Sequence, residues 1–401
     1  MYLLSNSIKA YAWGSFTALP VFLGRPSPAP APQAELWMGA HPAGSSQLWA
    51  QGRQYSLEAF CRLHPEALGA GWRSLPFLLK VLAVEKPLSL QVHPNLLEAR
   101  QGHAQERALG LPLEESHFPD ANHKPELLCA LTPFKALLGF EKPACLLPLL
   151  KALALPGLQA CLPLLRQEDE ALALRSFFES LLRWPKAERC ALLAQAKRGL
   201  RGLAQEGPWA QKAALAVRLL EDYPEDMGAL ASLCLNLVQL EPLEAVFVPA
   251  GCPHAYVHGM GVELMANSDN VLRGGLSTKR VDVEAFLSLL CFEGGAPPVQ
   301  KALPQAGEAW AFKTPAKEFC LSLARVSPQA PFAGRCKGPE IGLVLEGEVA
   351  AQGPGGTLRL RRGQSVFIPA QAPPYLLMGR GLVALATTAL EDGGTRVWPP
   401  G

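Results

Sequence analysis

The sequence lacks a large excess of charge of either sign and a long uninterrupted apolar run. Its 37 basic and 35 acidic side chains leave a formal net charge of +2, so charge gives no reason to expect a nucleic-acid or membrane-surface partner. The start, MYLLSNSIKAYAWGS, has no basic segment followed by a long apolar one, as a secretory signal would have. The most apolar segment, residues 144–165, contains Lys151 and three prolines, and its apolar runs are too short to cross a bilayer.

Closely spaced cysteine pairs are also missing. The ten cysteines are scattered from Cys61 to Cys336 without a Cys-x-x-Cys pair. This pattern is typical of free thiols in a reducing compartment, and not of a disulfide framework or a cysteine zinc site. We therefore expect a cytoplasmic location. At 401 residues, with 49% apolar and 18% charged side chains, the chain can fold into two or three domains or one large core with insertions.

What the sequence does contain changes character along the chain. The first 140 residues are rich in proline, glycine and short apolar runs, which predicts strands and loops, with buried strands over 75–84, 88–93 and the two halves of 125–140. Residues 141–235 are rich in leucine and alanine, with apolar residues at helical spacing, which predicts a helical insert. Strands return over 236–310, and short strands with glycine turns over 311–401 predict a second β unit. We expect 1–140 and 236–310 to form one discontinuous β unit.

A weak internal repeat relates the two β units. VFVPAGCPHAY (Val246–Tyr256) aligns with VFIPAQAPPYL (Val366–Leu376), and both lead an apolar strand into Pro-Ala and a tight turn. The second copy has Pro374 where the first has His254. The repeat therefore predicts two related β-barrels, of which only the first carries polar side chains for a functional site.

Three separate segments supply residue types that bind metals. Gln91 and His93 are two apart on a predicted strand and so share a face, Lys124 and Glu126 have the same spacing, and His254 follows the turn. Histidine and carboxylate are ordinary zinc ligands, glutamine is a less common one, and the same set could hold iron, manganese or cobalt.

Each segment alone also has a plain structural interpretation. Gln-Val-His can be a polar strand edge, and Asn-His-Lys-Pro-Glu can be a turn. His123 would face away from Lys124 and Glu126 on a strand. Five further histidines are interpreted as surface or capping residues: His41, His64, His103, His117 and His258.

Longer stretches carry a more specific signal. In chain order, Tyr11–Ser15 (YAWGS), Glu35–Pro42 (ELWMGAHP), Pro76–Asn95, Asp120–Phe140 and Val262–Val283 closely resemble type I phosphomannose isomerases, members of the cupin superfamily. The resemblance covers nearly the whole chain. It implies a mainly β fold with an α insert, made of cupin-type double-stranded β-helix (jelly-roll) barrels plus a helical domain, the last barrel being degenerate.

The resemblance also implies an activity and a metal. The activity is the interconversion of mannose 6-phosphate and fructose 6-phosphate through a cis-enediol, by a monomer with no nucleic-acid or membrane partner. The metal is one Zn²⁺ per chain, held by Gln91, His93, Glu126 and His254. Cys252 falls where the family varies, and it is given no role.

The reaction moves a proton between C1 and C2, which assigns tasks to further residues. Glu263 is a candidate base, because burial would raise its pKa toward working pH, and Lys279 is its rival. Arg273 and Lys124 suit the phosphate and the charged intermediate, and Ser89 shares a strand face with the ligands.

These assignments have plain alternatives too. Glu263 could be a strand carboxylate paired to a neighbouring lysine, and Arg273 a surface charge before a glycine turn. The tryptophan-containing stretches YAWGS and ELWMG could line the pocket wall or belong to an aromatic core.

Two other functions compete with the isomerase. A metal-dependent cupin oxygenase would want mostly histidine ligands and open positions on iron. A sugar-sensing or storage cupin would hold a structural metal and needs no basic phosphate site. Gln91 and the cluster of Lys124, Arg273 and Lys279 fit neither alternative as well as they fit a sugar-phosphate isomerase.

Overall fold

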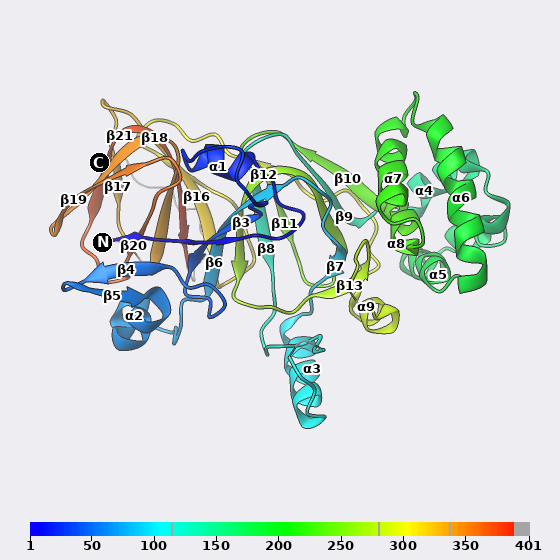
Figure 1. Cartoon of the computed structure of the whole chain (residues 1–401), viewed down its shortest axis with the longest axis horizontal. Helices are drawn as coiled ribbons and strands as arrows, with labels where there is room; N and C mark the ends of the chain where they lie inside the picture. Colours follow the sequence, from blue (N-terminus) through cyan, green and yellow to red (C-terminus); the bar gives the residue numbers. More distant parts are fainter. Residues whose placement is uncertain (114, 280, 337, 389–401) are drawn as a thin grey trace.

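Antiparallel sheets dominate the computed structural model, which describes residues 1–113, 115–279, 281–336 and 338–388 (Figure 1). Over these ranges the strands form an 11-stranded sheet, an 8-stranded sheet and a two-stranded hairpin. The helices α4 to α8 gather on the far side of the 11-stranded sheet from the 8-stranded one (Figure 1). The mainly β prediction with a helical insert is confirmed at this level.

The long strand β12 organises the 11-stranded sheet. Its first residues pair with β7 and β9, and its second half pairs with β6 and β8. Strand β6 is buried along its entire length, which explains why its sequence, FLLKVLAV, is nearly all apolar. The strands of this sheet are β2 (Ser7–Lys9), β3 (Glu35–Gly39), β6 (Phe77–Val84), β7 (Leu90–Val92), β8 (Glu126–Ala130), β9 (Phe134–Phe140), β10 (Leu235–Leu240), β11 (Glu244–Val248), β12 (His254–Ala266), β13 (Leu272–Gly275) and β14 (Gln300–Lys301).

The 8-stranded sheet joins the two ends of the chain. Tyr2 in β1 stands opposite Phe367 in β20, a pairing that no local sequence pattern predicts. Strand β20 leads through a turn into the long β21, just as β11 leads into β12, so both copies of the repeat are strand, turn and long strand. The strands are β1 (Tyr2–Leu4), β15 (Ala309–Ala311), β16 (Cys320–Val326), β17 (Phe332–Gly334), β18 (Glu340–Gly353), β19 (Gly356–Arg361), β20 (Ser365–Ile368) and β21 (Tyr375–Thr387), and the hairpin is β4 (Gln47–Ala50) and β5 (Arg53–Ser56).

The predicted helical insert is present between β9 and β10. Its helices turn their apolar stripes inward onto a core of leucine and phenylalanine side chains. Nowhere in the described ranges is a helix long and apolar enough to cross a bilayer. The helices of the insert are α4 (Pro143–Leu153), α5 (Glu170–Leu182), α6 (Lys186–Leu203), α7 (Ala210–Asp222) and α8 (Met227–Ala231), with short 3₁₀ segments at Pro156–Leu158, Leu162–Arg166 and Ser232–Cys234.

Helices outside the insert correct the prediction of strands and loops for the first 140 residues. The largest, α3 (Leu96–Ala108), buries only Ala99, so it lacks the apolar stripe by which a helix is usually recognised. Its one clear signal is a capping box, in which Asn95 and Glu98 satisfy each other's backbone N–H groups. The other helices are α1 (Ala18–Phe22), α2 (Leu57–Leu63) and α9 (Val283–Leu289), with a 3₁₀ segment at Pro65–Leu68.

The insert shares its apolar core with the sheet. Phe140 in β9 lies with its ring centroid 4.9 Å from that of Phe178 in α5 and 5.1 Å from that of Phe292. Leu90 of β7 and Leu272 of β13 belong to the same buried cluster. The insert therefore packs directly behind two strands that carry candidate site residues.

We expect Phe140→Ala to lower the free energy of unfolding by about 3–5 kcal/mol, because it leaves a cavity between the insert and the sheet. Chemical denaturation followed by circular dichroism measures the change. Phe16→Ala is the control, since that ring is 47% exposed. Equal losses for the two variants would contradict the packing described here.

Candidate active site

The predicted metal ligands lie at the ends of neighbouring strands. Gln91 lies in β7, and His93 is the first residue after the end of this strand. Glu126 is the first residue of β8 and His254 the first residue of β12. His254 stands opposite Gln91 in strand register, so segments far apart in the sequence meet at one place.

Three of these side chains form a tight, fully buried cluster, the His93–Glu126–His254 triad. One potential ligand atom from each lies within 4.8 Å of the others. Nε2 of His93 is 3.1 Å from Oε1 of Glu126, and Nε2 of His254 is 3.7 Å from Oε2. The structure thus brings together three of the four predicted ligands, in a group that could hold a metal ion.

The hydrogen bonds of the two imidazoles fix their tautomers. Nδ1 of His93 lies 2.8 Å from the carbonyl oxygen of Asn270, and Nδ1 of His254 lies 3.0 Å from that of Cys252. A carbonyl only accepts, so each Nδ1 carries the proton and each Nε2 presents a lone pair. Both Nε2 atoms are buried without a hydrogen-bond partner. Two lone pairs facing a carboxylate repel it unless a cation lies between them, so these residues fit a divalent metal ion.

The charge states agree with this fit. Burial lowers the pKa of His93 to about 3, and burial also lowers the pKa of His254, so both rings are neutral, as metal ligands must be. Burial alone would raise the pKa of Glu126, but the nearby Lys124 ammonium outweighs burial and brings this pKa well below its usual range. Glu126 is therefore a buried anion at neutral pH.

Glu126 has two further partners. Nζ of Lys124 lies 3.1 Å from Oε1, and the Tyr256 hydroxyl donates to Oε2 at 3.1 Å. Lys124 was predicted to contact the substrate, and its observed contact is with this carboxylate. Tyr256 was not predicted as a site residue. The sequence indicated it only through its position two residues after His254, which places both side chains on the same face of a strand.

A cavity of about 600 Å³ lies beside the triad. This volume falls in the range of roughly 300–1,000 Å³ that is usual for small-molecule sites. His93 and His254 lie behind the cavity wall, whereas Glu126 forms part of it. The other predicted site residues all line the cavity: Ser89, Gln91, Lys124, Glu263, Arg273 and Lys279. For Gln91, a role as ligand stays a prediction.

Glu263 lies on β12 directly opposite Lys80 on β6. Nζ of Lys80 donates to Oε2 of Glu263 at 2.9 Å and lies 3.6 Å from Oε2 of Glu35. Burial raises the pKa of Glu263 to about 7, although Lys80 opposes the rise. Burial lowers the pKa of Lys80, but Glu263, Glu35 and Glu126 outweigh it and raise that pKa. Glu263 is thus paired to a lysine, as the structural interpretation of this residue predicted, and it also lines the cavity.

Sequence reasoning missed Lys80 and Glu35. A lone lysine in the middle of the apolar run LPFLLKVLAV was the available signal, because a lysine is rarely buried without a partner. His41 was wrongly interpreted as a surface or capping residue: it is 5% exposed, lines the cavity and lies 3.3 Å from Asp269. The tryptophan-containing stretches do reach the cavity, through Trp13 and Trp37.

Arg273 and Lys279 are two cations at the wall of the cavity. Neither forms an ion pair with any carboxylate that the structure describes. Burial lowers the pKa of Arg273, and the nearby Arg273 guanidinium lowers the pKa of Lys279. Two neighbouring positive charges that each destabilise the other at a cavity wall are suited to binding an anion.

Comparisons with known proteins point to one family. A model of the family phosphomannose isomerase type I, catalytic domain, matches residues 1–143. The mannose-6-phosphate isomerase of Escherichia coli (strain K12) is 38% identical over 397 residues, which cover 96% of this chain and 98% of that protein.

Solved structures give the same result. A point mutant of phosphomannose isomerase from Salmonella typhimurium is similar with a TM-score of 0.89 at 36% identity, over 97% of this chain and 100% of that one. A zinc-bound mannose 6-phosphate isomerase is similar with a TM-score of 0.87 at 35% identity, over 97% of this chain and 99% of that one.

We expect His254→Ala to weaken zinc binding by more than about 100-fold, because removing even a group that only orients a ligand typically costs about 10–100-fold. Metal content after dialysis against a zinc buffer, measured by mass spectrometry, checks this. His258→Ala is a matched control, since it changes an exposed histidine of the same strand. Equal zinc content in both variants would contradict the metal-binding role of the triad.

Proposed function

Since this chain belongs to the type I phosphomannose isomerases, we propose that it interconverts mannose 6-phosphate and fructose 6-phosphate through a cis-enediol, as a monomer with one zinc ion. The observation that carries the proposal is a buried triad with two unprotonated imidazole nitrogens next to a cavity whose wall holds two cations, neither of them in an ion pair with a described carboxylate. A structural metal alone would need the triad but not the cations.

We propose that Gln91, His93, Glu126 and His254 hold the zinc. The tautomers of the two histidines and the low pKa of Glu126 support three of these, and the position of Gln91 opposite His254 supports the fourth. When bound, zinc supplies a Lewis acid that polarises the sugar carbonyl and stabilises negative charge on its oxygen.

Glu263 is the stronger candidate for the base that moves the proton between C1 and C2. The Tyr256 hydroxyl interacts with both Glu126 and Glu263, so Glu263 lies near the triad. Its buried carboxylate has a pKa near working pH, which suits a general base. Lys279 lies instead beside Arg273 and is only partly buried.

Arg273 and Lys279 then hold the phosphate or the negative charge that develops in the enediol. An Arg guanidinium can make two parallel hydrogen bonds to a phosphate. Lys124 holds Glu126 ionised and borders the same cavity, so it can contribute to both tasks. Ser89 lines the cavity and can donate a hydrogen bond to a sugar hydroxyl.

We also propose a cupin-type architecture for the two sheets, with a catalytic barrel from 1–140 and 236–310, a helical insert at 141–235 and a degenerate barrel at 311–401. The shared strand, turn and long strand arrangement of the two repeat copies supports this. The pairing of β1 with β20 attaches Tyr2–Leu4 to the second sheet, so the catalytic unit is not confined to its own barrel.

We expect chelation followed by gel filtration to reduce fructose 6-phosphate isomerase activity by at least about 100-fold, because the carbonyl then loses its Lewis acid. NMR of the two sugar phosphates measures turnover directly, without a coupling enzyme. Added zinc should restore it. Isomerisation that survives complete removal of the metal would refute the proposal, and oxygen uptake without isomerisation would favour an oxygenase instead.

We expect kcat/KM to rise with pH through about 7, since burial raises the pKa of Glu263 to about that value and only the ionised carboxylate can accept a proton. Glu263→Gln should remove most of the activity, and Lys279→Met should retain the rising limb at a higher KM. A pH profile of each variant separates the two bases: loss of the limb in Lys279→Met alone would make Lys279 the base.

A further inference from the structure

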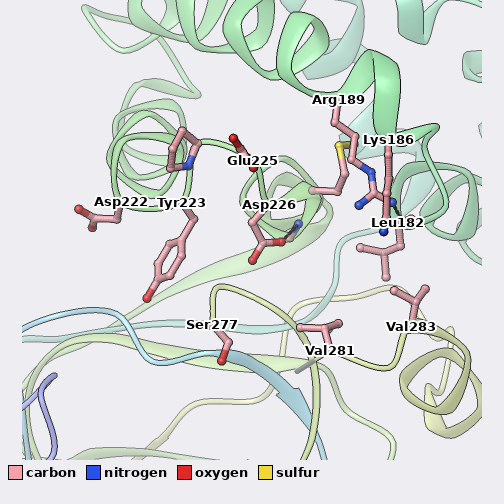
Figure 2. Close-up of a pocket in the computed structure, with 14 residues that line it drawn as sticks. Leu182, Lys186, Arg189, Asp222, Tyr223, Glu225, Asp226, Ser277, Val281 and Val283 are labelled. Atoms are coloured by element: carbon pink, nitrogen blue, oxygen red, sulfur yellow. Dashed lines mark hydrogen bonds between the residues drawn. The ribbon is translucent and has the colours of Figure 1, made fainter. Parts of the chain in front are cut away.

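The helical insert contacts the loop that carries two candidate anion-binding residues. A second cavity of about 570 Å³ lies between the insert and this loop, and Tyr223 and Ser277 line both it and the active-site cavity. Residues 273–279, here called the cation loop, comprise the last three residues of β13 and the turn that follows, and members of this segment line both cavities. Figure 2 shows the carboxylate of Asp226 pointing from the insert towards the part of this loop that carries Ser277.

Both oxygens of Asp226 are committed to backbone N–H groups. Oδ1 accepts from the Gly228 N–H at 2.7 Å and so caps α8, whereas Oδ2 accepts from the Leu276 N–H at 2.6 Å. The Ser277 N–H also hydrogen-bonds this carboxylate. A single side chain thus ties the start of a helix in the insert to the middle of the cation loop.

The cation loop has a backbone conformation that needs such support. Leu276 has a φ of 54°, in the left-handed region that costs about 1 kcal/mol or more for a residue with a side chain. The backbones of Gly228 and Gly275 are in close contact, because a Cβ on Gly228 would lie 2.8 Å from Cα of Gly275. At this point the backbone of the cation loop is therefore in direct contact with the insert.

We propose that Asp226 is a positioning residue, which holds the cation loop so that Arg273 and Lys279 face the active-site cavity. Asp226 itself does not line that cavity, so it acts through the loop backbone. This assigns the helical insert a part in substrate binding. The inference rests on the proposed function, in which these two cations bind the anionic part of the sugar phosphate.

Asp226→Asn tests the proposal with little change of shape. The amide has only one acceptor oxygen, so it cannot accept from both the Gly228 and the Leu276 N–H groups, and the tie between the insert and the cation loop is broken. We expect the KM for mannose 6-phosphate to rise about tenfold and competitive inhibition by inorganic phosphate to weaken by a similar factor, while kcat and zinc content change by less than about threefold.

A matched control changes another capping aspartate of the same insert. Asp169 caps α5 by accepting from the N–H groups of Ala171 and Leu172 and has no contact with the cation loop. Asp169→Asn should leave KM and phosphate inhibition unchanged. If Asp226→Asn behaves like Asp169→Asn, Asp226 is a helix cap only and the proposal is overturned.

Gly228→Ala provides a second variant that leaves the charge intact. The added methyl group presses on Gly275, so the same rise in KM is expected even where Asp226→Asn folds poorly. An unchanged KM would overturn the proposal.

A wild-type protein without isomerase activity would instead overturn the proposed function. Calorimetry with inorganic phosphate then tests the loop separately, since weaker phosphate binding in Asp226→Asn than in Asp169→Asn supports the positioning role and equal binding refutes it.

Discussion

A buried carboxylate facing two imidazole lone pairs is the constraint on which the rest of the site depends. An isolated ion in a protein interior is strongly destabilised unless charges and hydrogen bonds compensate it. Nζ of Lys124 lies 3.1 Å from one oxygen of Glu126 and compensates its charge. The Nε2 atoms of His93 and His254 carry no proton in the observed tautomers, so they cannot donate a hydrogen bond to the carboxylate. A divalent cation would accept both lone pairs, and the protein around the triad keeps these lone pairs aimed at one place.

That organisation extends well beyond the ligands. The Asn270 carbonyl orients His93, and the Asn270 side chain donates to the backbone carbonyls of Asp120 at 2.9 Å and Asn122 at 2.7 Å. The Ser268 hydroxyl donates to the Asp120 carboxylate. The segment leading into Glu126 is therefore fastened to the segment that orients His93. Groups of this kind fix ring orientation and raise ligand basicity, so mispositioning them weakens the site without touching a ligand.

The sequence predicted the parts of this arrangement that depend on local pattern. Two-residue spacing on strands and the turn before His254 made His93, Glu126 and His254 candidate ligands, and the resemblance to the family implied that they act as a set. The insert was recognised from helical spacing. Lys80, by contrast, acquires its meaning from register: it meets Glu263 because β6 pairs with β12, across 183 positions of sequence. The pairing of β1 with β20 is equally non-local, and α3 was missed because a helix that is polar on all sides lacks the expected periodicity.

Two buried carboxylates lie on either side of one tyrosine, and their different surroundings suit the two roles proposed for them, holding a metal and accepting a proton. Burial acts to raise the pKa of both, but Lys124 outweighs it at Glu126, whereas Lys80 only partly offsets it at Glu263. One carboxylate is thereby fixed as an anion, and the other titrates near neutrality. Environments that drive the pKa values of neighbouring groups apart are the physical basis of divided acid–base roles. The strand β12, which carries His254 at its start and Glu263 nine residues later, delivers both environments to one cavity.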